Sequence, residues 1–223
     1  MKAEENTGLT LYTYWRSSAA YRVRIALNLK GLTFKSIPVH LVRQGGEQRG
    51  EAFRSLNPQG LVPVLLHEGN VLTQSMAICE YLDERFDEYL LLPTDPLERA
   101  RVRSMALQIA CDIHPLNNLR VLQYLKAHST GTWDTAAWMA HWMTEGFSAI
   151  EQQLADRPDS DSGFCSDRAG LFECFLVPQV YNAERYATDL SAFPRIRQLV
   201  GKCRQLSAFS RAAPEKQPDA DQI

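Results

Sequence analysis

The alternation of hydrophobic and polar positions predicts a small α/β unit at the start of the chain. Residues 9–14 alternate and predict a strand, and residues 18–30 carry apolar side chains at helical spacing up to Gly31, a residue type that often ends helices. Residues 34–39 alternate again, and a strand–helix–strand order of this length predicts a right-handed crossover between parallel strands. The pattern then predicts a loop at 40–51, a strand at 62–67, a hairpin turn at 68–70, a short strand at 71–73 and a helix at 76–86 that Ser75 caps.

The second half of the chain has the longer periodicity of helices. Residues 97–128 have the pattern of one long helix, which Pro115 should kink. Further helices are expected from Thr132 or Asp134 to Leu154, from Gly170 to Ala187 and from Pro194 onward, with a polar loop at 156–169.

The change of pattern divides the chain. A linker with two prolines at 87–96 predicts a boundary between a domain at residues 1–88 and a helical domain at 96–213. The polar, proline-bearing tail at 214–223 is expected to be disordered.

Composition narrows the functional classes. A net charge of −2 gives no general basic surface for nucleic acid, and no apolar run approaches the ~18 residues of a membrane span. The first eight residues lack the apolar core of a signal peptide. The five cysteines form no C-x-x-C pair, so we expect no metal site and a reduced, cytoplasmic compartment, with Cys79 and Cys111 as small buried residues.

The turn after the first strand carries two adjacent serines, Ser17 and Ser18, where the first helix should begin. Serine is a preferred N-cap, and the amide-rich end of a helix attracts anions, including a thiolate. A serine hydroxyl placed there could donate to a bound thiolate and lower its pKa. The simpler alternative is that both serines only cap the helix.

A second polar pair, Gln74-Ser75, precedes another helix. Two helix N-termini in one small unit could hold two anionic groups of one ligand, such as the carboxylates of a peptide. Val62, before a Pro63 in a position that suits a cis bond, could offer its backbone N–H and C=O to a peptide-like ligand. A plain helix cap at Ser75 is the alternative.

A third set is cationic. Arg16 adjoins Ser17, His114 and Arg120 lie on the long helical pattern, and Arg185 lies near the end of the helix that begins at Gly170. The planar fork of arginine suits bidentate binding of carboxylates. The alternative is that these are surface or ion-paired side chains.

Five blocks of the sequence together resemble the zeta-class glutathione S-transferases, over about residues 9–213 and in the same order. They are RSSAAYRVRIALNLKGL, NPQGLVPVL, TQSMAICEYLDE, DIHPLNNLRVL and VPQVYNAERY. The resemblance implies an N-terminal thioredoxin-like domain of α/β class that binds glutathione, an all-α C-terminal domain and a homodimer.

The resemblance also implies roles for single residues. The serine that stabilises the thiolate matches Ser17, with Ser18 beside it, and the arginine that holds a substrate carboxylate matches Arg185, with Arg16 and Arg120 as further candidates. Glutathione contacts match Gln48, Val62, Gln74, Ser75, Asn118, Leu119 and Arg120, with His114 facing the glutathione.

Two positions depart from the family pattern. Ala19 stands where the family has a cysteine, which bears on side activities more than on isomerisation. Gly170-x-x-Glu173 replaces a Thr-x-x-Asp helix cap and should weaken it.

The activity implied is that of a glutathione-dependent cis–trans isomerase converting maleylacetoacetate, a small diketo acid, to fumarylacetoacetate in tyrosine and phenylalanine catabolism. Glutathione acts there as a coenzyme and is not consumed. The alternatives are maleylpyruvate as the substrate, a general transferase or dehalogenase, or a non-catalytic scaffold that binds a partner protein.

Overall fold

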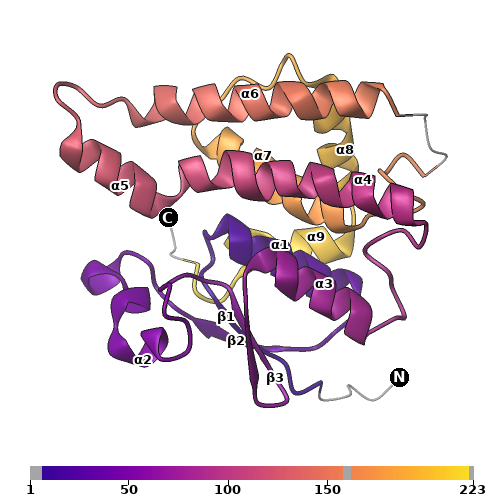
Figure 1. Cartoon of the computed structure of the whole chain (residues 1–223), viewed down its shortest axis with the longest axis horizontal. Helices are drawn as coiled ribbons and strands as arrows, with labels where there is room; N and C mark the ends of the chain where they lie inside the picture. The colour runs from indigo at the N-terminus through magenta and orange to yellow at the C-terminus, as the bar shows by residue number, and fades with distance from the viewer. Residues whose placement is uncertain (1–6, 158–161, 221–223) are drawn as a thin grey trace. The chain divides into compact units, whose positions relative to one another are not determined.

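The computed structural model describes residues 7–157 and 162–220 of the 223-residue chain. Expectations for residues 1–6, for part of the 156–169 loop and for the last three residues of the tail lie outside the described residues. The chain divides into two units, one formed by the residues up to Leu91 together with the segment from Gln205, and one formed by Leu92–Arg204 (Figure 1).

The first unit is built on a four-stranded sheet with the order β2-β1-β3-β4. Strand β1 (Thr10–Thr13) pairs in parallel with β2 (Lys35–Pro38), which confirms the predicted parallel pair, and antiparallel with β3 (Val64–His67). Strand β3 pairs antiparallel with β4 (Asn70–Thr73). Both residues of the connecting turn, Glu68 and Gly69, have positive φ, as two-residue hairpins of this twist require.

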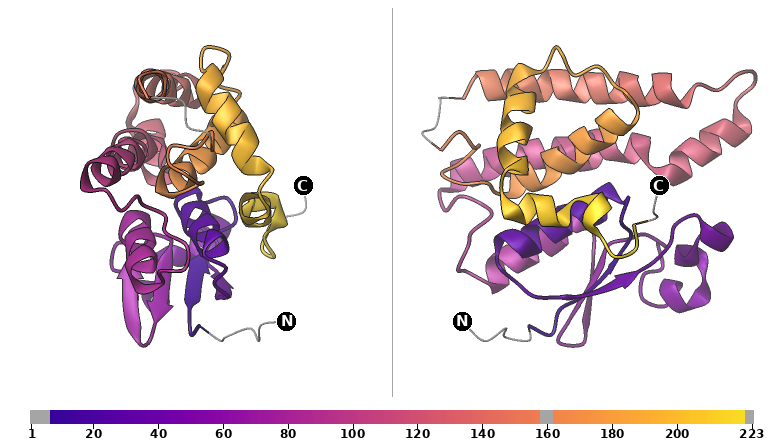
Figure 2. Two further views of the ribbon diagram at one scale, coloured as in Figure 1. Left: turned by 90° about the vertical axis from the view of Figure 1, so that its right-hand side faces the viewer. Right: turned by 180° about the vertical axis from the view of Figure 1, so that it is seen from behind.

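Two helices follow the strands as expected, α1 (Ser18–Leu29) and α3 (Ser75–Arg85), and they pack against each other on one side of the sheet (Figures 1 and 2). The expected loop after β2 contains two short 3-10 turns, η1 (Arg43–Gly45) and η2 (Glu47–Arg49), and leads into α2 (Glu51–Arg54).

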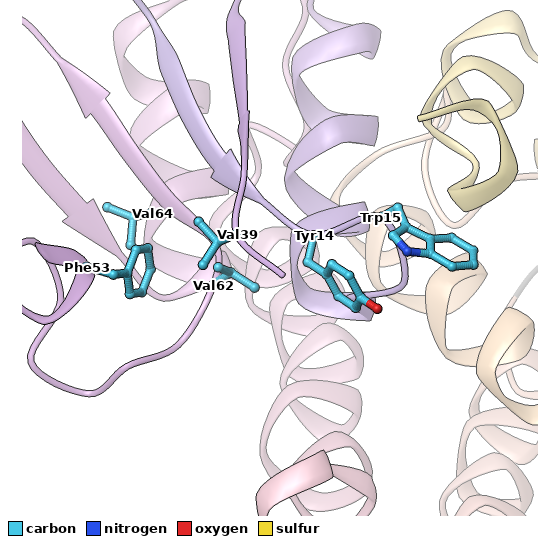
Figure 3. Close-up of a cluster of buried hydrophobic side chains, with 6 residues drawn as sticks. All are labelled: Tyr14, Trp15, Val39, Phe53, Val62 and Val64. Atoms are coloured by element: carbon cyan, nitrogen blue, oxygen red, sulfur yellow. The ribbon is translucent and has the colours of Figure 1, made fainter. Parts of the chain in front are cut away.

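A cluster of buried apolar side chains holds the end of β1 in place. Figure 3 shows Tyr14 and Trp15 at one end of this cluster and Phe53 and Val64 at the other, with Val39 and Val62 between them. The Val62–Pro63 peptide bond is cis, as predicted. The cluster therefore joins the residues just before Ser17 to the residue before this proline.

The second unit consists of helices. They are α4 (Pro96–Leu107), η3 (Gln108–Ile113), η4 (His114–Asn117), α5 (Leu119–His128), α6 (Thr135–Ala155), α7 (Leu171–Arg185) and α8 (Pro194–Arg204). Helix α7 packs against α4, α6 and α8, and all residues from Leu171 to Val180 are buried.

The expectation of one long helix at 97–128, only kinked at Pro115, is wrong. A π-helical turn, η3, and a 3-10 turn, η4, interrupt it, and Asn118 leaves the helix with φ −71° and ψ 141°. Pro115 lies in the first turn of η4, where its missing N–H does least harm. Asn118 Oδ1 accepts from the Arg120 N–H at 3.1 Å, so a new helix, α5, begins with its own cap.

The start of α7 is held by Glu173 rather than by its first residue. Glu173 Oε2 accepts from the Gly170 N–H and Oε1 from the Cys165 N–H, both at 2.8 Å. Gly170 has no side chain, so only this half of a capping box exists. Burial raises the pKa of the Glu173 carboxyl, against the effect of these donors.

The C-terminal segment differs from the expected layout. Helix α9 (Ser207–Ala212) packs along α1, and the 3-10 turn η5 (Pro214–Lys216) follows it (Figure 2). The segment from Gln205 therefore belongs to the first unit, and residues 214–220 are folded where a disordered tail was expected. Polar composition alone does not reveal that this segment finds hydrogen-bond partners on the sheet-bearing unit.

Candidate active site

The serine turn, residues 14–17, connects β1 to α1. The Ser17 N–H donates to the Tyr14 carbonyl at 3.0 Å, and Ser17 Oγ accepts from the Ala20 N–H at 3.2 Å, so Ser17 is the N-cap of α1 as predicted. Within the described residues the Ser17 hydroxyl donates no hydrogen bond, and Ser18 beside it is half-buried. The Ser17 hydroxyl can therefore cap the helix and still donate its proton to an anion.

Ser75 does not cap α3. Gln74 holds the N-cap position, no side chain caps the helix, and the Ser75 hydroxyl instead accepts from Arg22 Nη1 at 3.1 Å. Both residues are buried. The prediction of a plain cap at Ser75 is therefore wrong, because Ser75 is itself the first residue of α3 and Gln74 holds the cap position.

The N-terminus of α3 carries two features of an anion site. Among the described residues, no side-chain oxygen accepts from its first backbone N–H groups, and Arg22 adds a buried positive charge beside Ser75. Gln74 has φ 68°, a conformation that costs a non-glycine residue about 1–3 kcal/mol and that clusters at functional sites. Its side-chain amide donates to Gln59 Oε1 at 2.9 Å.

Gln48 and Val62 both lie in the first unit and are buried. Gln48 Nε2 donates to the Leu41 carbonyl at 3.2 Å, whereas Gln48 Oε1 is buried with no partner among the described residues. A Cβ on Gly46 would lie 2.6 Å from this amide, so the glycine makes room for it. An unpaired buried amide oxygen fits a site that a polar ligand completes.

Four further candidate residues lie in the second unit, where the expected long helix is interrupted. His114 begins η4, Asn118 caps α5, and Leu119 and Arg120 are exposed in the first turn of α5. Helix α7 packs against η3, the turn that precedes His114.

The two other predicted arginines are exposed and each lies over an aromatic ring. Arg185, at the end of α7, lies 4.9 Å from the ring centre of Tyr186, and its Nη2 donates to the Tyr186 hydroxyl at 3.2 Å. Arg16 lies 5.0 Å from the ring centre of Trp15 in the first unit. Stacking of this kind orients a guanidinium and leaves part of its fork available.

The thiols do not form a reactive centre. Burial raises the pKa of Cys79 to about 12, although the nearby Arg22 charge opposes this rise. Cys111 is exposed, so the expectation that it is buried is wrong. Within residues 7–157 and 162–220, no three histidine, cysteine or acidic side chains are grouped to hold a metal, and no helix is long and apolar enough to cross a membrane.

Comparison with known proteins identifies the family. The model of the glutathione S-transferase N-terminal domain matches residues 16–85. Maleylacetoacetate isomerase from Pseudomonas aeruginosa is 48% identical over 213 residues, which cover 95% of this chain and 98% of that protein. A solved structure of maleyl pyruvate isomerase, a bacterial zeta-class glutathione S-transferase, has a TM-score of 0.90 at 44% identity and covers 95% of this chain and 100% of that one.

This chain belongs to the zeta-class glutathione S-transferase family.

A further similar structure, maleylacetoacetate isomerase from Anaeromyxobacter dehalogenans, was solved with GSH bound in its active site. It is 40% identical to this chain, with a TM-score of 0.83 and coverage of 96% of this chain and 98% of that one. The fold is that of the family, with a thioredoxin-like unit around a four-stranded sheet and a helical unit.

Sequence reasoning missed one residue of the candidate site, Arg22, which donates to Ser75. The available signal was the pair Arg22 and Arg24 within an otherwise apolar helix. Two residues span roughly 200° around a helix, so the two side chains leave α1 on opposite sides. Both are at most 2% exposed, and each must therefore find partners inside the protein.

Proposed function

We propose that this chain is a glutathione-dependent cis–trans isomerase that converts maleylacetoacetate to fumarylacetoacetate in tyrosine and phenylalanine breakdown. The observation that carries the glutathione site is the uncapped N-terminus of α3, where buried Arg22 binds Ser75. The reaction is supported by relatives of nearly the same length that are named for it.

The residues present fit glutathione, a tripeptide with two carboxylates and a thiol. Ser75 and the first N–H groups of α3 suit a carboxylate, and the unpaired Gln48 oxygen suits an N–H of the peptide. The Ser17 hydroxyl, at the N-terminus of α1, suits the sulfur. Bound glutathione would supply a thiolate that adds reversibly to an activated cis double bond.

The protein's own residues then have separate tasks. Ser17 donates a hydrogen bond that keeps the sulfur ionised near neutral pH, as donors at helix N-termini do for thiolates. Val62, Gln74, His114, Asn118 and Arg120 remain proposed contacts of the same ligand, with Ser18 as the alternative donor to the sulfur.

Arg185 is the proposed partner of a substrate carboxylate, with Arg16 and Arg120 as further cations. Its stacking on Tyr186 holds the guanidinium plane, which suits bidentate binding of a carboxylate. Cations placed this way also stabilise the negative charge that develops on a diketo acid when the thiolate adds to its double bond and an enolate forms.

Maleylpyruvate is the second candidate substrate, because one similar structure bears that name. Both substrates carry two carboxylates and a cis double bond, so the arginines do not distinguish them. We further propose a cytoplasmic homodimer, as the family resemblance implies. Sedimentation velocity would test the dimer.

The experiment that tests this function measures kcat/KM for both substrates, in wild-type protein and in a variant of Arg185. Wild-type protein should isomerise maleylacetoacetate with the higher kcat/KM, and only in the presence of glutathione. Arg185→Lys should lower this kcat/KM ~100-fold or more, because lysine lacks the planar fork, while glutathione affinity stays near the wild-type value. The exposed Arg195→Lys is the matched control.

Full isomerase activity in Arg185→Lys, or equal losses toward diketo acids and a neutral alkyl halide, contradicts the carboxylate-binding role. A higher kcat/KM for maleylpyruvate assigns the second candidate. A protein retained on glutathione-agarose that isomerises neither substrate points to a transferase, and a protein that is not retained points to a scaffold.

A further inference from the structure

The backbone of the serine turn is held from inside the first unit by Arg24. The Arg24 side chain is 1% exposed, and its Nη1 donates to Thr13 Oγ1 at 3.0 Å and to the Tyr14 carbonyl at 3.3 Å. Its Nη2 donates to the Trp15 carbonyl at 3.0 Å. One rigid guanidinium thus fixes the successive carbonyls of Tyr14 and Trp15, three and two residues before Ser17.

The same guanidinium also binds the C-terminal segment. Arg24 Nε donates to the Ala212 carbonyl at 3.1 Å, at the end of α9. Farther along α1, Asn28 Nδ2 donates to the Ala208 carbonyl at 3.0 Å. The C-terminal segment is therefore bonded to the helix that carries Ser17 at its start.

A second anchor reaches the serine turn from outside. The Trp15 N–H donates to Asp219 Oδ2 at 3.0 Å, across a separation of 204 residues. We call residues 213–220 the C-terminal strap. Gln217 shapes it by donating to the carbonyls of Arg211 and Ala213, both at 2.9 Å, and Ala220 packs on the apolar cluster that contains Tyr14 and Trp15.

We propose that Asp219 is a positioning residue, which holds the serine turn so that the Ser17 hydroxyl is aimed at the ligand sulfur. This inference rests on the proposed function of Ser17. Trp15 lies two residues before Ser17, and its N–H bonds the serine turn to the strap through Asp219. Arg24 instead binds carbonyl groups of the turn.

The physical reason is that a catalytic hydroxyl works only within narrow limits of position. A displacement of ~1 Å at such a group can cost ~100-fold in rate, and supporting hydrogen bonds provide the restraint. The turn Tyr14–Ser17 is short and lies at the end of a strand, so fixing its N–H and C=O groups also fixes the first turn of α1.

The first measurement needs no ligand. Amide hydrogen exchange of the Trp15 N–H should be about tenfold or more faster in Asp219→Ala than in wild type, because the amide loses its acceptor. Asp219→Asn keeps an acceptor oxygen and should retain much of the protection. Lys216→Ala, an exposed change in the same strap, is the control and should match wild type.

The second measurement follows the sulfur. Asp219→Ala should raise the pKa of the bound glutathione thiol, seen in the pH dependence of its thiolate absorbance, and lower kcat/KM about tenfold. The dissociation constant for glutathione should change less than about threefold, because the proposed carboxylate contact at α3 is left intact. Asp219→Asn should recover most of both effects, which a general loss of stability would not produce.

Unchanged Trp15 exchange in Asp219→Ala overturns the contact. Faster exchange with an unchanged thiol pKa and kcat/KM overturns the positioning role while the proposed function stands. A wild-type protein that neither ionises glutathione nor isomerises a maleyl diketo acid overturns the proposed function and the role of Asp219 with it. Faster exchange together with the shifted pKa and the rescue by Asn supports the proposal.

Discussion

At the scale of single residues, Ser17 has one observed role and one proposed role. Its oxygen accepts from the Ala20 N–H, while its proton is available to an anion. A substitution at Ser17 therefore affects both helix stability and the ligand, and the two effects need separate controls.

We predict that Ser17→Ala raises the pKa of the bound glutathione thiol by about 1–2 units. A hydrogen bond to a charged group contributes about 1.5–3 kcal/mol, and one pKa unit corresponds to about 1.4 kcal/mol. The thiolate absorbance across a pH titration measures this shift. Ser17→Thr keeps both cap and hydroxyl and should restore it, and a shift found in Ser18→Ala instead would assign the role to Ser18.

Ser75 works together with a buried charge. Ser75→Ala should weaken glutathione binding about tenfold or more, because it removes a charge-assisted hydrogen bond of about 1.5–3 kcal/mol and one partner of Arg22. Calorimetry with glutathione measures the change. The exposed Ser36→Ala is the control, and an unaltered dissociation constant in Ser75→Ala would remove Ser75 from the site.

At the level of whole elements, the N-termini of the helices show which of them can bind an anion. Helix α1 begins at a serine cap, and α3 begins without a side-chain cap, beside a buried arginine. Helix α7 begins at a glycine whose N–H donates to the Glu173 carboxylate. The two starts in the first unit suit anions, whereas the start of α7 is closed by its own carboxylate.

Glu173→Gln should destabilise the protein by about 1–3 kcal/mol near neutral pH. The two carboxylate oxygens each accept one backbone N–H, and an amide leaves one of these donors unpaired. Thermal or denaturant unfolding measures this difference, with the exposed Glu145→Gln as the control.

The same pair of proteins tests the raised pKa of Glu173. Burial makes the folded protein bind this proton more tightly than the unfolded chain does, so the contribution of Glu173 falls as the pH rises through the folded-state pKa. The stability difference between wild type and Glu173→Gln should therefore widen as the pH is lowered from about 7 toward 5. A constant or narrowing difference would contradict the raised pKa.

For the whole molecule, the testable consequence is linkage between ligand and stability. Glutathione at a hundred times its dissociation constant should stabilise the native state by about 2.7 kcal/mol, which corresponds to a rise in Tm of about 5–10 °C. Free cysteine at the same concentration has the thiol but not the spacing of the two peptide carboxylates, and should have little effect. Equal shifts with both compounds would mean that the carboxylate contacts are absent.

Much of the architecture follows from local patterns. The four strands, the hairpin with its two left-handed residues and the cap at Ser17 are set by alternation, turn chemistry and capping, which act over a few residues. The resemblance of five sequence blocks then supplied the family, and the comparisons confirm it.

Three features came only from the tertiary structure: the break of the expected long helix at Asn118, the burial of Arg22 and Arg24, and the return of the C-terminal segment to the first unit. Arg22 finds its partner 53 residues away, Arg24 finds one 188 residues away, and Trp15 finds Asp219 204 residues away. Periodicity and propensity describe neighbours along the chain, whereas a buried charge or amide is satisfied by whichever group the fold brings to it. For this reason the helices and strands could be predicted from local sequence. The long-range hydrogen-bond partners around the candidate site could not.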